Sequence, residues 1–399
     1  MSMLSFDAAL EQLLAAARPI GEIQEVDTLA ACGRVLARSQ VSTLDVPPLD
    51  NSSMDGYAVS SVDVPQAGTA LRVSQRIAAG SVGHALMPGT AARIFTGAPV
   101  PAGADAVVMQ ELCAHEGETV IINHVPSPGD WIRRSGEDIR CGAQILSAGT
   151  RLRPQEIGLA ASVGLARLPV CRRLRVAVFF TGDELVMPGE PLPQGAIYNS
   201  NRFTTRALLE LLGCEFSDFG IVPDYLEATR SALREAAHGH DLIITSGGMS
   251  VGEEDHVKPA VEAEGELSLW KIAIKPGKPL AFGRVGGAVF AGLPGNPVSS
   301  FVTFLLLVRP FILSMQGVTQ PFAHAQQLCA DFDLPKPDAR REFLRARVDA
   351  NGRLALFPNQ SSAVLTSTVW GDGLIDNPAG QVIRRGDSVR FLPFSELLY

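Results

Sequence analysis

Apolar positions near the N-terminus recur with helical spacing and then lose it. Within the first twenty residues they fall on one helical face, and Ser5 precedes them as an N-cap candidate. The pattern predicts an amphipathic helix over residues 6–17. From about 40 to 140, short apolar runs are broken by Pro and Gly without a helical period, which predicts a β-rich segment.

From 174 to 310, continuous apolar runs alternate with helical patterns. This alternation is typical of an α/β domain with a largely parallel sheet covered by helices. Parallel sheets bind ligands beyond the carboxyl ends of their strands, so the following loops should carry the chemistry. Strands are expected at 174–180, up to 221, at 242–245 and at 270–274, with helices at about 202–212 and 225–237.

The last eighty residues predict a small all-β domain. Runs at 343–348 and 354–357 flank an Asn-Gly pair, which indicates a hairpin. A second hairpin is expected over 382–391. The longest apolar stretch, 301–308, is far short of the ~20 residues that cross a bilayer.

Composition narrows the class of protein. With 399 residues and 46% hydrophobic content, the chain should form two to four domains. A net charge of −8 without a basic run argues against nucleic acid and membrane partners. The N-terminus has no signal-peptide pattern, which predicts a cytoplasmic protein. The six cysteines are widely spaced and are expected to be buried small residues, and His238 and His240 are expected to cap a helix.

Lysine usage is uneven. Only five of the 34 basic residues are lysines, and Lys271, Lys275 and Lys278 lie within eight positions. Prolines stiffen the backbone between them, so compact ammonium groups would be presented to a phosphate or an oxyanion. The alternative is a solvated strand end.

Two turns could bind anions through backbone N–H groups. Ser246, Gly247 and Gly248 follow a predicted buried strand, and glycines there allow close approach to a phosphate. A rigid turn before the next helix could present the positive end of that helix. Both turns could equally be structural connectors. The second turn consists of Pro294, Gly295, Asn296 and Pro297.

Acidic and polar loop residues complete the candidate site. Glu184 and Asp224 follow predicted strands, where carboxylates are suited to Mg²⁺, although helix capping would also explain them. Asp255, after the glycine-rich turn, could cap the next helix. The β-rich segment adds polar loops, which could either carry functional residues or be ordinary surface loops. These loops carry Asp55, Thr96, Arg133 and Asp138.

In this order, the motifs resemble the MoeA family of molybdopterin molybdenumtransferases, which includes the E domain of gephyrin. The resemblance covers nearly the whole chain, although the family often has a second acid where Tyr225 follows Asp224. The matching blocks are residues 50–58, 96–101, 136–138, 181–185, 246–252, 271–279 and 293–299.

The resemblance implies a four-part subunit and a homodimer, in which the lever domain of one subunit meets the central domain of the other. The parts are a helical linking domain (1–44 and 141–172), a β-rich lever domain (45–140), a central α/β molybdopterin-binding domain (173–320) and a C-terminal β-barrel (321–399).

The implied reaction joins molybdate to adenylylated molybdopterin, releases AMP and uses Mg²⁺. The resemblance also implies contacts with a molybdopterin adenylyltransferase and with apo-molybdoenzymes. Asp55, Asp138, Glu184, Asp224, Lys271 and Lys275 would be catalytic, with Glu184, Asp224 and Asp255 as metal ligands. Thr96, Arg133, Lys278 and the two turns would bind substrate, and residues 361–367 would give a supporting contact.

Two alternatives follow from the same resemblance. A molybdopterin adenylyltransferase would use ATP and share the central fold, but would need neither lever nor barrel. A gephyrin-like scaffold would bind other proteins without needing the lysine and carboxylate set.

Overall fold

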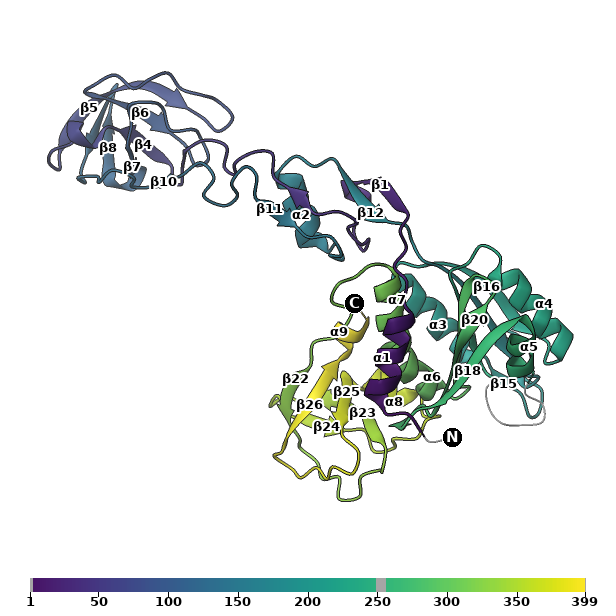
Figure 1. Ribbon diagram of the computed structural model, residues 1–399. Coiled ribbons are helices and arrows are strands. Elements are labelled where there is room, and N and C mark those ends of the chain that lie inside the picture. Colours follow the sequence, from purple (N-terminus) through teal and green to yellow (C-terminus); the bar gives the residue numbers. More distant parts are fainter. Residues whose placement is uncertain (1–2, 249–255, 399) are drawn as a thin grey trace.

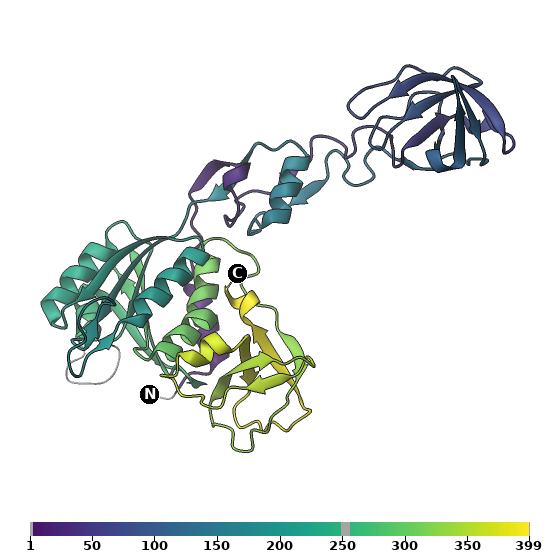
Figure 2. The same ribbon diagram turned by 180° about the vertical axis from the view of Figure 1, so that it is seen from behind.

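The computed structural model describes residues 3–248 and 256–398. The molecule is extended: a β-rich unit lies at one end, a narrow connecting segment follows, and a larger two-part body lies at the other end (Figures 1 and 2). The predicted multidomain α/β and β architecture is confirmed.

The N-terminal helix α1 (Phe6–Ala16) forms as predicted. The Ser5 hydroxyl accepts a hydrogen bond from the Ala8 N–H at 3.2 Å and so caps the helix. Its buried side chains, among them Phe6 and Leu13, pack into the core of the large body, far along the sequence from most of their neighbours. The helix therefore anchors the start of the chain to the body.

The β-rich segment contains a six-stranded sheet, here called the lever sheet, in the order β7-β4-β6-β5-β9-β8. Its aliphatic core is separate from the core of the body. The strands of this segment are β3 (Asn51–Ser52), β4 (Gly56–Val59), β5 (Thr69–Ile77), β6 (Thr90–Ile94), β7 (Ala106–Met109), β8 (Cys113–Glu116), β9 (Thr119–Ile122) and β10 (Ile132–Arg133).

The connecting segment is made from two passes of the chain. β1 (Ile23–Asp27) pairs with β12 (Arg167–Cys171), and β2 (Gln40–Val41) pairs with β11 (Gln144–Leu146), both antiparallel. Helix α2 (Pro154–Ser162) packs beside them (Figure 1). The chain thus leaves for the lever sheet and returns from it at neighbouring points.

The central sheet has the order β16-β13-β17-β21-β20-β18 and is mixed. The first four strands are parallel, β20 is antiparallel to β21, and β18 is antiparallel to β20, so the prediction of a mostly parallel sheet is confirmed and β20 is the one reversed strand among its described strands. The strands are β13 (Arg175–Thr181), β16 (Glu215–Val222), β17 (Leu242–Ser246), β18 (Gly265–Lys271), β20 (Pro279–Val285) and β21 (Ala288–Leu293).

Helices cover both faces of this sheet (Figure 1). On one face, α4 (Leu226–Ala237) and α5 (Val257–Glu264) bury alanine and valine side chains against Phe179 and Phe290. On the other face, α1, α3 (Ser200–Leu211) and a long helix over Pro297–Met315 cover alternate residues of the same strands. His240 Nδ1 lies 2.9 Å from the carbonyl oxygen of Ala236 in the last turn of α4, as expected for a C-terminal cap.

This long helix is strongly apolar. It runs over Pro297–Met315 as α6 (Pro297–Thr303), a π-helical stretch (Phe304–Val308) and α7 (Arg309–Met315). It is long and apolar enough to cross a membrane, but 89% of its apolar window is buried inside the protein. Arg309 does not end it, because the guanidinium donates to the Pro321 and Glu396 carbonyl oxygens.

The C-terminal unit is a sheet of order β19-β23-β25-β26-β22, with β24 beside β23. The predicted β-barrel is not confirmed, because β19 and β22, at the two ends of this order, are not paired in the described strand order. An isolated bridge between Ala330, after β22, and Leu354 of β24 brings those two segments together. Its elements are β19 (Ile274–Lys275), β22 (Gln326–Cys329), β23 (Arg341–Val348), β24 (Leu354–Leu356), β25 (Gly373–Asn377), β26 (Ser388–Pro393), α8 (Thr366–Trp370) and α9 (Phe394–Leu398).

Two predicted β elements differ from the structure. The strand expected over 270–274 is two strands: β18 ends at Lys271 in the central sheet, and β19 pairs with β23 of the C-terminal sheet. The hairpin expected over 382–391 is wrong, because Ile383 bridges to Leu334 while β26 pairs with β22 and β25. The hairpin between β23 and β24 is confirmed.

The expectation of buried cysteines is also largely wrong. Only Cys214 is buried, and burial raises the pKa of its thiol to about 12. Cys113 and Cys171 are partly buried, and the remaining three, Cys32, Cys141 and Cys329, are exposed. All six are free thiols. A role as a small buried residue therefore accounts for Cys214 alone among the six cysteines.

Candidate functional site

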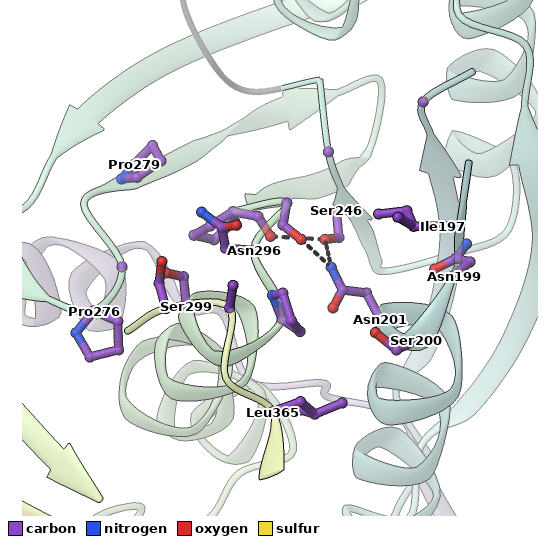
Figure 3. Close-up of a pocket in the computed structure, with 18 of the residues that line it drawn as sticks. Ile197, Asn199, Ser200, Asn201, Ser246, Pro276, Pro279, Asn296, Ser299 and Leu365 are labelled. Carbon is purple, nitrogen blue, oxygen red and sulfur yellow. Dashed lines mark hydrogen bonds between the residues drawn. The ribbon is translucent and has the colours of Figure 1, made fainter. Parts of the chain in front are cut away.

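A pocket of about 1200 Å³ lies at the carboxyl edge of the central sheet, closed on one side by the C-terminal unit (Figure 3). Its wall takes residues from the loops after β13, β16, β17 and β21, as expected for a sheet of this kind. From the candidate set it collects Glu184, Asp224, Ser246, Gly247, Gly248, Lys275, Lys278, Pro294, Gly295, Asn296 and Pro297.

The backbone conformation of the turn after β17 requires glycine. Gly247 and Gly248 have φ values of +100° and +61°, a region that side chains disfavour. A Cβ on Gly247 would lie 2.5 Å from the Thr181 carbonyl oxygen, and one on Gly248 would lie 2.5 Å from Val257 Cγ2. The turn therefore packs against β13 and α5 and leaves its backbone at the pocket wall.

An asparagine ties three of the pocket loops together. The side-chain amide of Asn201, on α3, donates to Ser246 Oγ and to the Gly295 carbonyl oxygen, both at 2.8 Å. Ser246 Oγ in turn donates to the Pro294 carbonyl oxygen at 2.9 Å. Figure 3 shows this network between α3, the end of β17 and the Pro294–Pro297 turn.

The N-terminus of α3 also faces the pocket. Asn199 caps this helix, because its Oδ1 accepts a hydrogen bond from the Arg202 N–H at 3.1 Å. Only 2% of Asn199 is exposed, and its Nδ2 has no hydrogen-bond partner among the described atoms. A buried amide donor at the pocket wall is suited to an acceptor atom of a ligand.

Two of the three predicted lysines line the pocket. Lys278 is exposed at the rim, and Lys275 is held by carboxylates of the C-terminal unit, Glu342 at 3.1 Å and Asp338 at 3.4 Å. Lys271 is outside the pocket wall, because β18 ends there and the chain then turns toward β19. The expected three-lysine cluster is therefore reduced to two lysines.

A further cation at the pocket was missed from the sequence. Arg340 donates to both carboxylate oxygens of Asp338, at 2.9 and 3.0 Å. These hydrogen bonds hold the pKa of Asp338 well below its usual range, so this carboxylate stays ionised. Arg340 lies near Lys275 only after the C-terminal unit folds against β19, and nothing in its sequence neighbourhood indicates that contact.

Carboxylate groups of the pocket are few. Glu184 follows β13 and Asp224 follows β16, so each stands beyond its strand. Asp255 lies outside the described residues. Among the residues that are described, no group of three or more His, Cys, Asp or Glu side chains is placed to hold a metal ion. A cation here would need oxygen ligands from elsewhere.

The candidates from the β-rich segment are remote from this pocket in one chain (Figure 1). Asp55 accepts two 2.8 Å hydrogen bonds from Thr96, one from its backbone N–H and one from its hydroxyl. The backbone bond is the main reason that the pKa of Asp55 is lowered. Arg133 and Asp138 are both exposed.

Several pocket residues had no signal in the sequence. Asn199 and Asn201 precede and open a helix, where asparagine is ordinarily a cap. Residues 361–367 were expected only as a supporting contact, yet Ser361, Ser362, Ala363 and Leu365 line the wall, together with Gln360, which no sequence pattern indicated. These residues meet the central sheet through the contact between the two units of the body.

Comparison with known families matches three segments. The MoeA N-terminal region (domains I and II) matches residues 4–164, a probable molybdopterin binding domain matches 177–314, and the MoeA C-terminal region (domain IV) matches 327–394. Together these segments span most of the chain.

Relatives match over nearly their full length. The molybdopterin molybdenumtransferase of Haemophilus influenzae is 40% identical, covering 99% of this chain and 100% of the relative. Molybdopterin molybdenumtransferase 2 of Mycobacterium tuberculosis H37Rv is 37% identical over 94% and 95%. A molybdopterin biosynthesis MoeA protein of Pyrococcus horikoshii OT3 superposes with a TM-score of 0.85 at 28% identity, over 98% and 100%. The chain belongs to the MoeA family.

Proposed function

We propose that this protein is a molybdopterin molybdenumtransferase, which inserts molybdenum from molybdate into adenylylated molybdopterin and releases AMP. The observation that carries the proposal is the large pocket at the carboxyl edge of the central sheet, in a chain whose relatives carry that name. Its wall combines cations, backbone turns and carboxylates, which suits a substrate with several anionic groups.

The cations of the pocket would bind the anions. Lys278 at the rim would contact phosphate or molybdate oxygens, because charge-assisted hydrogen bonds are about twice as strong as neutral ones. Lys275 and Arg340 are held in place by Asp338 and Glu342, so their positions are set before substrate arrives. The Gly247–Gly248 turn would donate backbone N–H groups to the same substrate.

We also propose that carboxylates of the pocket bind a magnesium ion. Mg²⁺ commonly takes one or two protein carboxylates and completes its shell with water and phosphate oxygens. Glu184 and Asp224 supply two such groups at neighbouring strand ends. They would hold the ion, which would neutralise charge on the phosphates. Asp224 and Glu184 would otherwise orient water beside the phosphoanhydride.

A homodimer belongs to the same proposal. Asp55, Thr96, Arg133 and Asp138 lie on the far side of the connecting segment, out of reach of the pocket in their own chain. A two-fold dimer that brings the lever sheet of one subunit to the pocket of the other would unite the two sets. Cytoplasmic action, with delivery of substrate by a molybdopterin adenylyltransferase and transfer of product to apo-molybdoenzymes, completes the proposal.

The decisive experiment is AMP release from adenylylated molybdopterin and Mg²⁺ by the purified protein, with and without molybdate. We expect release that depends on molybdate and a product that activates an apo-molybdoenzyme. Adenylylation of free molybdopterin by ATP, with no AMP release, would instead identify an adenylyltransferase. Absence of both activities would favour a scaffold.

A further inference from the structure

An aromatic residue in an unfavourable backbone conformation lies near the candidate residues of the lever sheet. Trp131 has a φ of +53°, the one positive value outside glycine among the described residues. Such a conformation is rare for a bulky side chain and is kept only where the surroundings fix it. Even so, 42% of Trp131 remains exposed.

Hydrogen bonds on both sides of the residue fix this conformation. The Trp131 carbonyl oxygen accepts two bonds of 2.9 Å from Ser53, one from its N–H and one from its hydroxyl. The carbonyl oxygen of the preceding residue, Asp130, accepts the Val107 N–H at 2.9 Å. The backbone is therefore held from two neighbouring segments, and the indole is kept at the surface rather than folded into a core.

The segments next to Trp131 carry polar residues and a cation. Arg133, two residues on, is exposed and forms no ion pair or side-chain hydrogen bond within the described chain, unlike Arg134, which binds Asp50 at 2.6 Å. Ser53 belongs to the same loop as Asp55, whose carboxylate holds Thr96. The indole, the guanidinium and the Asp55–Thr96 pair thus share one group of adjoining loops.

We propose that Trp131 is a stacking residue for a flat nitrogen heterocycle that carries a phosphate, and that Arg133 contacts that phosphate. A partly exposed indole, two residues before a guanidinium that forms no ion pair within the described chain, suits such a ligand. Any heterocyclic ring offers a π face, and the phosphate offers oxygen acceptors. This inference rests on the proposed function, whose substrate has two such rings, adenine and pterin. The pocket that holds the rest of the substrate would belong to a second copy.

Two substitutions separate stacking from packing. Trp131→Phe keeps a flat ring, whereas Trp131→Leu keeps an apolar side chain without one. We expect Trp131→Leu to raise KM for adenylylated molybdopterin roughly tenfold with little change in kcat, and Trp131→Phe to stay within about threefold. Equal effects of both variants, matched by equal losses in thermal stability, would show a structural role and overturn the proposal.

Intrinsic fluorescence provides a readout besides activity. AMP and neopterin are titrated separately into the full-length protein, and the ring that quenches the emission identifies which end of the substrate stacks. The quench should disappear in Trp131→Phe and persist in Trp370→Phe, because Trp370 packs against Phe357. Persistence of the quench in Trp131→Phe, or quenching by neither probe, would contradict the assignment.

Three further results would distinguish this inference from the proposed function and from a role in subunit contact. If the unaltered protein turns over substrate but Trp131→Leu has an unchanged KM, this inference fails and the proposed function stands. If the unaltered protein has no turnover, the proposed function fails first. If Trp131→Leu is monomeric by light scattering while the unaltered protein is dimeric, the indole serves subunit contact and not ligand stacking.

Discussion

At the residue scale, the pocket depends on which polar groups are held and which remain available. Lys275 is committed to Glu342 and Asp338, whereas Lys278, three residues later, has no ion pair within the described chain and stands exposed at the rim. The two lysines are therefore unequal, although the sequence presents them as equivalents. A substrate anion would gain most from the unpaired ammonium.

We expect Lys278→Met to lower kcat/KM for molybdenum insertion by about 100-fold, the order of magnitude for the loss of one charged donor at a reacting site. Steady-state AMP release measures the effect. Lys336→Met is the matched control, since Lys336 is an exposed lysine outside the pocket wall and its loss should change activity less than twofold. Similar losses in the two variants would point to overall charge.

The carboxylate of Asp338 predicts a pH-dependent contribution to stability. Hydrogen bonds from Arg340 lower its pKa in the folded protein from the ordinary 3.8. The unfolded chain therefore binds the proton first as pH falls, and the stabilisation is complete above about 3.8 and is lost as pH decreases through the folded pKa.

Urea unfolding of the unaltered protein and of Asp338→Asn tests this dependence. The difference in unfolding free energy should be largest near neutral pH and should shrink as the pH is lowered below 3.8. A difference that stays constant across that range would mean that the carboxylate contributes through shape and not through charge.

At the element scale, the apolar pattern predicts an element correctly where all of its apolar residues are buried within one domain. The helices near 6–17, 202–212 and 225–237 form because their apolar spacing reflects a single buried face. The strand at 242–245 forms because its continuous apolar run is buried on both faces of the central sheet. The segment 270–274 fails for the opposite reason. Its apolar residues are divided between two sheets, and no local pattern records that division.

The site residues also fall into two groups, those that the sequence indicates and those that it does not. Glycines, prolines and acids after strands were found from the sequence because local backbone chemistry demands them. Asn201 and Arg340 act through partners far along the chain, the first through Gly295 and the second beside Lys275. Contacts of that range depend on how elements pack, which the spacing of residues in one segment does not encode.

Asn201→Ala should loosen the connection between α3, β17 and the Pro294–Pro297 turn. Two hydrogen bonds are lost, so we expect a destabilisation of about 1–3 kcal/mol and a raised KM, while Ser246 Oγ keeps its bond to Pro294. Arg206→Ala, on the exposed side of the same helix, should stay within about 0.5 kcal/mol. Denaturant unfolding and steady-state kinetics compare the two, and an unchanged KM for Asn201→Ala would contradict the role in positioning.

At the scale of the whole molecule, the proposed dimer makes a quantitative prediction. Asp55→Asn would impair the lever half of each site, and Lys278→Met would impair the pocket half. After the two inactive proteins are mixed, unfolded and refolded, half of the dimers should be mixed, and each of those should have one site with both halves intact. Activity should return to about a quarter of the unaltered level. No recovery would mean that each site belongs to one chain.

The two-pass connecting segment has a consequence for engineering. Because β2 and β11 are hydrogen-bonded neighbours, the whole β-rich unit between them is inserted into an otherwise continuous fold and its ends lie close together. Such a unit can be excised and the gap closed with a short turn, or exchanged for the corresponding cassette of a relative. Chimaeras built at this junction would allow the β-rich unit and the rest of the molecule to be varied independently.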